Sequence, residues 1–311
     1  GMTMKDLRIV FMGTPEFSLP ALEKIHQRFG IQAVVTVPDK PQGRGKKLQA
    51  SPVKLKAQQL GIKIYQPEKL SEEFFLDEMR VLQPDIFVVI AFRILPAALF
   101  TIPKIASFNV HASLLPKYRG AAPINWAIIN GEKFTGLTTF ILQEKVDTGN
   151  IILQSSMEIP ENSTAGDLSD MLKQLSVDIS FNTIELLASG NYKLFPQDNS
   201  KTSPAPKIFP EGCRISWNLH SRDLRNFING VSPMPGAWTR WNDLRLKILR
   251  CTYCSCGNAT PGTFIIDKNK FIIYAVKGYI EPLEIQLQGK RQMKTKDFLL
   301  GYRGEKEGKM V

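Results

Sequence analysis

The sequence predicts an α/β protein: a mostly parallel, doubly wound sheet followed by a smaller C-terminal β-barrel. Short β-branched runs alternate with amphipathic stretches over the first part of the chain, which is typical of parallel strands joined by helices. A segment rich in Pro, Ser and Asn then precedes closely spaced short strands. The length of 311 residues suits two domains. We therefore expect a first domain at 1–190, a linker at 191–207 and a barrel at 208–311.

Each element is expected where the hydrophobic pattern changes. Strand 85–92 is apolar on both faces, as in the centre of a parallel sheet. The turn after the first strand, Gly13-Thr14-Pro15, lacks the further glycines of a dinucleotide-binding fingerprint. The remaining strands are expected at 7–12, 31–37, 62–65, 106–112, 136–142, 150–155, 245–250 and 271–276, and the helices at 17–29, 51–60, 71–82, 123–130, 164–189 and 221–228.

Composition excludes several classes of protein. The longest apolar run, 86–92, is far shorter than the ~20 residues that cross a bilayer, so no membrane segment is expected. The N-terminal text shows no export signal, which predicts a cytoplasmic protein whose four cysteines stay reduced. Cys251, Cys254 and Cys256 lack the second paired cluster of a zinc site, and no metal is expected.

The charge of +11 is unevenly distributed along the chain. Residues 207–311 carry 18 Lys and Arg against 9 Asp and Glu, a net charge of +9. A second basic stretch at 39–56 includes Arg44, Lys46 and Lys47 and carries +5. Two separate basic regions on a protein that is otherwise near neutral indicate a polyanionic partner.

The end of the strand at 106–112 carries the residues best suited to catalysis. Asn109 and His111 are two apart and so share a face of the strand. An amide that donates hydrogen bonds beside an imidazole that moves protons can perform acyl transfer through an oxyanion. Asp147, which precedes a turn at another strand end, is the best candidate to orient the imidazole.

These residues lie in a longer run, Phe108-Asn109-Val110-His111-Ala112-Ser113-Leu114-Leu115-Pro116-Lys117-Tyr118-Arg119-Gly120, with Asp147-Thr148-Gly149 downstream. The run resembles the folate-loop signature of the formyltransferases that use 10-formyltetrahydrofolate. The stretches at 7–17 and 38–47 resemble the members of this family that act on methionyl-tRNA, and the likeness covers nearly the whole chain. The resemblance implies a Rossmann-like formyltransferase sheet and an OB-like barrel.

The resemblance also implies the reaction and the sites. The enzyme is expected to transfer a formyl group from 10-formyltetrahydrofolate to the α-amino group of initiator methionyl-tRNA, for translation initiation, and to be a monomer. Catalysis is expected from Asn109, His111 and Asp147. The folate is expected to contact Ser113, Leu114, Leu115, Pro116, Ala91, Phe92 and Asp147, and the aminoacyl-tRNA to contact Gly13, Thr14, Arg44, Lys46 and Lys47.

Two alternatives stay open. A sugar-nucleotide amine formyltransferase of the same family shares the Ser-Leu-Leu-Pro text, although a sugar nucleotide does not require the cationic stretch at 43–47. A non-enzymatic RNA-binding protein would explain the charge but would not require Asn109, His111 and Asp147 at strand ends. Folate binding separates the second alternative from the others.

Overall fold

The computed structural model describes residues 6–311, and the chain divides into two compact units. Unit 1 contains the chain up to Gly120 together with 135–157 and 169–204. Unit 2 contains 121–134, 158–168 and 205–311. Residues 1–5 of the first predicted domain lie outside the described residues, and the predicted boundaries at 190 and 208 stay predictions.

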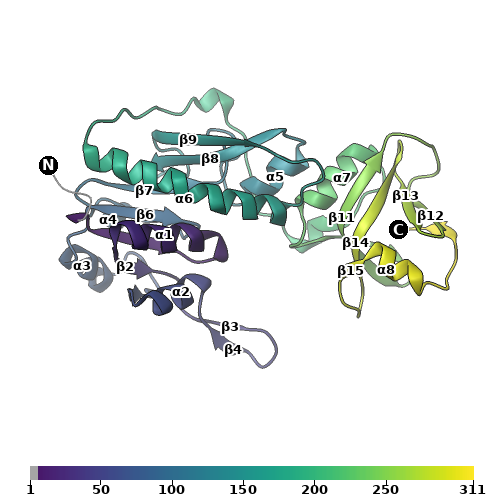
Figure 1. Ribbon diagram of the computed structural model, residues 1–311, viewed down its shortest axis with the longest axis horizontal. Helices are drawn as coiled ribbons and strands as arrows, with labels where there is room; N and C mark the ends of the chain where they lie inside the picture. The colour runs from purple at the N-terminus through teal and green to yellow at the C-terminus, as the bar shows by residue number, and fades with distance from the viewer. Residues whose placement is uncertain (1–5) are drawn as a thin grey trace. The chain divides into compact units, whose positions relative to one another are not determined.

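Unit 1 is built on the seven-stranded sheet of Figure 1, in the order β5-β2-β1-β6-β7-β8-β9. The pairs among its first five strands are parallel, whereas β7 pairs antiparallel with β8, which confirms the mostly parallel sheet. The central strands β1 and β6 are buried along their whole length, as expected from their apolar sequences. The strands are β1 (Ile9–Gly13), β2 (Ile31–Val35), β5 (Lys63–Tyr65), β6 (Ile86–Ile90), β7 (Ala106–His111), β8 (Phe134–Ile141) and β9 (Ile151–Glu158).

The helices of the first domain begin and end at local signals in the sequence. In α2 (Pro52–Leu60), the hydroxyl of Ser51 caps the first turn by accepting from the Lys54 N–H, and Gly61 ends the helix with a left-handed φ of 70°. The others are α1 (Leu19–Phe29), α3 (Glu73–Val81), a short α4 (Ala97–Phe100) that the sequence did not predict, α5 (Pro123–Ile129) and α6 (Ala165–Ser189).

The basic stretch after β2 forms a separate two-stranded hairpin, β3 (Lys40–Gln42) and β4 (Lys47–Gln49), which projects from the sheet of unit 1 in Figure 1. The sequence predicted only a loop here. The turn between the two strands is possible because Gly43 and Gly45 take left-handed φ values of 71° and 81°. All residues of both strands are exposed.

Unit 2 contains a curled antiparallel sheet, in the order β10-β11-β14-β13-β12-β16, with β15 paired to β14. This sheet confirms the predicted OB-like barrel. The Trp241 ring lies at the centre of its core, where it contacts Phe264, Phe271 and Phe298. The elements are α7 (Ser221–Gly230), β10 (Ala237–Trp241), β11 (Leu244–Cys254), β12 (Thr263–Asp267), β13 (Lys270–Tyr274), β14 (Tyr279–Leu287), β15 (Met293–Lys294), α8 (Thr295–Leu300) and β16 (Glu307–Lys309).

Unit 2 also holds parts of the chain that precede the barrel. The Asn125 amide of α5 donates to the Gly230 carbonyl (2.9 Å), and the Trp126 indole donates to the Pro206 carbonyl (2.7 Å). A chain that ends at Pro206 would keep the Pro206 carbonyl but would lose the Gly230 carbonyl to which Asn125 of α5 donates. Point substitutions are the better test of the barrel.

The cysteines differ from the expectation that all four stay reduced. Cys254 and Cys256 form a disulfide, with Cα atoms 5.3 Å apart, so the expectation is wrong for this pair. The physical reason is that β11 ends at Cys254 and the chain bends at the next residue, which brings Cys256 within bridging distance. Cys213 and Cys251 are free, and burial raises the pKa of both thiols.

Among residues 6–311, no cluster of three or more His, Cys, Asp or Glu side chains is arranged to hold a metal ion. No helix in this range has the length and apolar character needed to cross a bilayer.

Candidate active site

Three neighbouring parallel strands of unit 1 end beside one another, and six of the fourteen predicted site residues lie at or just beyond these ends. Gly13 at the end of β1 pairs with Ile90 at the end of β6, and Ile90 pairs with Val110 of β7. The carboxyl ends of parallel strands form the ligand-binding crevice of open α/β sheets. The predicted residues that meet at this edge are Gly13, Thr14, Ala91, Phe92, Asn109 and His111.

The turn after β1 is set by close packing. A Cβ atom at Gly13 would lie 2.7 Å from the Ile90 carbonyl oxygen and 2.8 Å from the Ser18 hydroxyl, so only glycine fits. The next residue, Thr14, has a buried hydroxyl with no hydrogen-bond partner among the described residues. Thr14 is thus a residue of this turn whose buried polar group is left unsatisfied by the described residues.

His111 is buried at the end of β7, with only 8% of its side chain exposed. Its Nε2 lies 2.8 Å from the Tyr118 carbonyl oxygen, and its Nδ1 lies 3.7 Å from Oδ1 of Asp147. A carbonyl can only accept, so Nε2 carries a proton in this arrangement and Nδ1 faces the carboxylate. The imidazole is therefore closer to the Tyr118 carbonyl than to the Asp147 carboxylate. The sequence could not reveal this contact, because it is made by a main-chain group.

Asn109 lies on the same strand and, two residues before His111, on the same face. Its side chain is partly exposed. Within residues 6–311 the Asn109 amide has no hydrogen-bond partner, so its two N–H groups are available to a ligand.

Asp147 contacts His111 from the turn that follows β8. Its backbone has a φ of 58°, which is unusual for a residue other than glycine. Oδ2 accepts a hydrogen bond from the Gly120 N–H (2.9 Å), and the main-chain carbonyl accepts one from the Gln197 amide (2.9 Å). The carboxylate is 11% exposed, so both its position and its environment are fixed by the fold.

The Ser-Leu-Leu-Pro loop is held by side chains of the neighbouring strands β8 and β9. The Thr138 hydroxyl donates to the Ser113 carbonyl (2.7 Å) and accepts from the Leu115 N–H (3.1 Å), and the Gln154 amide donates to the Leu115 carbonyl (2.8 Å). Ser113 and Leu115 are buried, whereas Leu114 and Pro116 are partly exposed. Thr138 and Gln154 shape this loop, and the sequence contained no motif that marked them.

The neighbouring loop after β6 is anchored by Arg93. Its guanidinium stacks on the Phe92 ring (5.0 Å to the centroid) and donates to the carbonyls of Pro67 and Glu68, both at 2.9 Å. Burial lowers the pKa of Arg93. Ala91, which precedes this pair, is exposed and has a φ of 53°. Arg93 thus fixes the Phe92 ring, a contact that the sequence did not predict.

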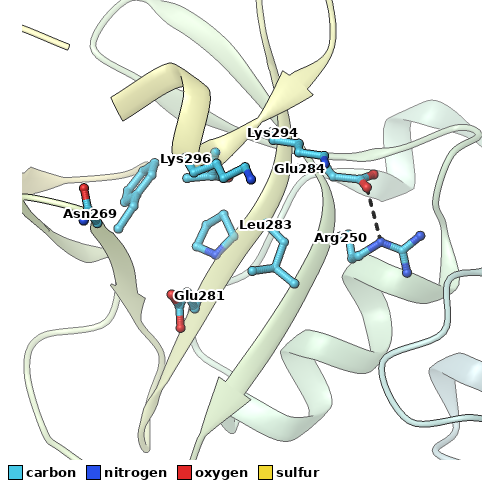
Figure 2. Close-up of a pocket in the computed structure, with 10 residues that line it drawn as sticks. Arg250, Asn269, Glu281, Leu283, Glu284, Lys294 and Lys296 are labelled. Atoms are coloured by element: carbon cyan, nitrogen blue, oxygen red, sulfur yellow. Dashed lines mark ion pairs between the residues drawn. The ribbon is translucent and has the colours of Figure 1, made fainter. Parts of the chain in front are cut away.

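The predicted cationic residues do not lie at the strand ends. Arg44, Lys46 and Lys47 are exposed on the β3–β4 hairpin. Figure 2 shows a different feature, a hollow of about 300 Å³ in unit 2, next to the ion pair between Arg250 and Glu284 (3.5 Å). None of the predicted site residues lines this hollow.

The sequence of the chain matches a family of known proteins. The formyl transferase profile matches residues 7–184, and the profile of the formyl transferase C-terminal domain matches 207–303. Methionyl-tRNA formyltransferase from Porphyromonas gingivalis is 41% identical over 314 residues, which cover 97% of each chain. The protein of the same name from Chlorobium limicola is 42% identical, over 96% of this chain and 97% of the relative.

The chain belongs to the methionyl-tRNA formyltransferase family. The resemblance inferred from Asn109, His111 and Asp147 is therefore confirmed at the level of the family. This membership favours the methionyl-tRNA branch over the sugar-nucleotide branch, because the sugar-acting neighbours are more distant.

Solved structures of formyltransferases share the fold of the chain. The sugar 3N-formyl transferase WlaRD, with dTDP and 5-N-formyl-THF, aligns over 92% of this chain and 99% of that one, with a TM-score of 0.68 and 24% identity. HypX from Aquifex aeolicus, in complex with tetrahydrofolic acid, aligns over 94% of this chain and 47% of that one, with a TM-score of 0.65 and 13% identity. At these identities the likeness concerns the fold.

Proposed function

We propose that this protein transfers the formyl group of 10-formyltetrahydrofolate to the α-amino group of methionyl-initiator-tRNA. The observation that carries the proposal is His111, held at the end of β7 between the Tyr118 carbonyl and the Asp147 carboxylate, with the free amide of Asn109 on the same face. Relatives named for this activity match the chain from end to end. Monomeric state and cytoplasmic location stay predictions.

The reaction forms a bond between the α-amino nitrogen and the formyl carbon and breaks the bond between that carbon and N10 of the folate. An α-amino group has a pKa of about 7.7–8.0, so about a fifth to a third of it is neutral near pH 7.4. Because Nε2 donates to the Tyr118 carbonyl, we assign Nδ1 of His111 to accept the proton that the attacking amine releases and to return a proton to the departing N10. The Asn109 amide is placed to donate to the oxyanion that develops on the formyl oxygen.

For the folate we propose the edge formed by the loops after β6 and β7. Phe92, fixed by Arg93, offers an aromatic face, and the partly exposed Leu114 and Pro116 offer apolar contacts. Buried Ser113 and Leu115 act on this site by shaping the loop. The Asp147 carboxylate is a suitable acceptor for amino groups on the pterin edge.

For the aminoacyl end of the tRNA we propose the Thr14 turn, and for the nearby phosphates the β3–β4 hairpin. Arg44, Lys46 and Lys47 are exposed and form no ion pair with an acidic side chain among residues 6–311. Cations that lack internal partners release counterions when they meet a phosphate backbone, which favours RNA binding.

For the body of the tRNA we propose the outer face of β10 and β11, here called the barrel face and composed of Arg214, Trp238, Arg240, Arg245 and Lys247. Trp238 pairs with Lys247, and Arg240 pairs with Arg245, across these strands. Cross-strand partners and residues two apart on a strand project from the same face.

The cations of the barrel face are not compensated within the fold. Arg240 and Arg245 stand directly opposite each other, an arrangement that is unfavourable unless an anion lies between them. None of the four cations pairs with an Asp or Glu side chain in the described chain, although Arg214 donates to the Val311 carbonyl (2.9 Å). The guanidiniums of Arg245 and Arg214 lie over the Trp238 ring, at 3.8 Å and 5.5 Å from its centroid. Stacking restricts these arginines before any phosphate arrives, which reduces the entropy lost on binding.

One assay tests the proposed function. Protein and 10-formyltetrahydrofolate are incubated with methionyl-initiator-tRNA, with elongator methionyl-tRNA or with an amino-sugar nucleotide, and the formylated product is quantified. Transfer to initiator methionyl-tRNA above both other acceptors is expected. Transfer to the sugar nucleotide alone would establish the sugar branch, and tRNA binding without folate binding would establish an RNA-binding protein.

A further inference from the structure

The last segment of unit 1, residues 195–203, hydrogen-bonds to both loops that flank His111, and we call it the strap. Phe195 pairs with Ile151 next to the Asp147 turn, through N–H to carbonyl contacts of 2.7 and 2.9 Å. The N–H of Tyr118 donates to the Ser203 hydroxyl (3.0 Å), and the N–H of Arg119 donates to the Ser203 carbonyl (2.9 Å). The sequence suggested only a linker in this region.

Gln197 is the strap residue that connects the two loops through one side chain. Its Nε2 donates to the carbonyl oxygens of Asp147 (2.9 Å) and Gly149 (2.8 Å). Its Oε1 accepts from Nε (3.1 Å) and Nη2 (2.8 Å) of Arg119. A glutamine amide has two donors and two acceptor lone pairs, so its hydrogen-bonding capacity is filled by these contacts.

The Asp147 turn requires such support. The three residues before Asp147 are exposed, and Asp147 itself has a left-handed φ of 58° that is unfavourable for a side chain with a Cβ atom. Its carboxylate is held by the Gly120 N–H, and Gly120 follows Arg119 directly. Gln197 therefore links the main chain of Asp147 to Arg119, the residue that precedes Gly120.

We infer that Gln197 is a positioning residue for formyl transfer, which holds the Asp147 carboxylate at His111 through the two hydrogen bonds that it donates to the Asp147 turn. The inference rests on the proposed function, because it needs the roles assigned to His111 and Asp147. Small displacements of a catalytic group cost rate without weakening substrate binding, so the loss is expected in kcat and not in KM.

Three variants separate positioning from a purely structural role. Gln197→Glu keeps the length of the side chain and an acceptor for Arg119 but removes both donors. Gln197→Ala removes all four contacts. Asn199→Ala is the matched control, because Asn199 is the other strap side chain that accepts from Arg119 (3.0 Å), and among residues 6–311 its side chain forms no hydrogen bond with the Asp147 turn. We expect kcat to fall by about tenfold or more in both Gln197 variants, with KM for the charged tRNA unchanged, and to stay within about twofold in the control.

A double-mutant cycle tests whether Gln197 acts through Asp147. In the Asp147→Asn background, Gln197→Ala should cause less than about a twofold further loss in single-turnover rate, because residues that act as a unit are not additive. Thermal melting of every variant reports whether the fold persists, and Gln197→Glu covers the case in which Gln197→Ala does not fold.

The outcomes are distinguishable. If Asp147→Asn loses rate while Gln197→Glu keeps it, or if the two losses multiply, the positioning role of Gln197 is wrong and the proposed function stands. If Asp147→Asn transfers the formyl group at the normal rate, or if the unmodified protein transfers none, the assignment of the site fails. The role of Gln197 then fails with it.

Discussion

The end of β7 and the barrel face are both rich in polar side chains, but they differ in how those side chains are partnered. His111 and Asp147 are buried, contact each other and are held by main-chain groups of neighbouring loops. Arg240 and Arg245 are exposed, stand opposite each other and have no acidic partner in the described chain. The proposed formyl transfer needs groups that the fold holds in place, whereas the proposed RNA binding needs charge that the fold leaves uncompensated.

The largest effect is expected at the end of β7. His111→Ala and Asn109→Ala should each lower the single-turnover rate of formyl transfer by at least about 10²-fold, because they remove the proton carrier and an oxyanion donor. The measurement is rapid-quench analysis of formylmethionyl-tRNA, with circular dichroism to verify the fold. A rate near that of the unmodified protein in either variant would contradict the assigned roles.

The second prediction concerns the charge of Asp147. Asp147→Asn keeps an oxygen that can accept from the Gly120 N–H but removes the negative charge that faces Nδ1 of His111. We expect a rate loss of nearly 10²-fold in the same assay. Normal rate with normal folate affinity would show that the contact with the Tyr118 carbonyl suffices to orient the ring.

The third prediction concerns the β3–β4 hairpin. Replacing Arg44, Lys46 and Lys47 together by Gln should raise KM for charged tRNA about tenfold or more and leave folate affinity unchanged, because among residues 6–311 these exposed side chains form no ion pair or hydrogen bond with the folate loops. Steady-state kinetics and equilibrium binding of 5-formyltetrahydrofolate measure the two quantities. Equal losses in both would indicate that the hairpin supports the fold.

The fourth prediction addresses the barrel face. Arg240→Ala with Arg245→Ala should weaken tRNA binding about tenfold at physiological salt and reduce the slope of log affinity against log salt by about two, roughly one for each lost phosphate contact. Lys268→Ala with Lys270→Ala is a matched control, since it removes the same charge from exposed positions at the β12–β13 turn.

The position of Trp238 sharpens this prediction. Trp238→Ala removes no charge, so it should weaken binding severalfold with little change in the salt slope, and Trp238→Phe should restore part of the affinity. If the arginine pair and the lysine control lower tRNA affinity and the salt slope by the same amounts, the charge of the barrel attracts tRNA without a defined binding site.

The smallest effect is expected on stability, at the ion pair between Asp167 and Arg250. Arg250 is a cation of the barrel that does have acidic partners within the fold. Its guanidinium binds Asp167 (2.6 and 3.1 Å), and the hydrogen bonds from Arg250 hold the pKa of that carboxyl below its usual range. Asp167 also accepts from the Thr164 N–H, which caps the start of α6. Asp167→Asn should cost about 1 kcal/mol of unfolding free energy at pH 7, a value discounted because the carboxylate is 34% exposed.

The sign of the pH dependence follows from the lowered pKa. The carboxylate binds fewer protons in the folded state, so its contribution is complete above the ordinary Asp pKa near 3.9 and is lost as pH falls through the lowered value. Chemical denaturation at pH 7 and near pH 3 should therefore show a smaller difference between variant and parent at the lower pH. Asp170→Asn, at an exposed pair on the same helix, should have little effect at either pH.

The alternation of elements could be predicted from the sequence because it depends on local hydrophobic periods, and so could the face shared by Asn109 and His111, because strand geometry has a period of two. The sequence also showed the excess of charge in residues 207–311. It could not show which of those cations are free. Arg250 and Arg245 both lie on β11, and only the folded chain places Asp167 against the first and Arg240 opposite the second.

The contacts that hold the proposed catalytic residues come from tertiary packing. The Tyr118 carbonyl that contacts His111 is a main-chain group, which every residue possesses and no motif reveals. Gln197 lies 50 residues from Asp147 in the chain, and its contacts are to carbonyl oxygens, so no spacing in the sequence connects the two. Local patterns determine which residues can do the chemistry, whereas long-range hydrogen bonds, formed only when distant segments pack together, determine where those residues are held.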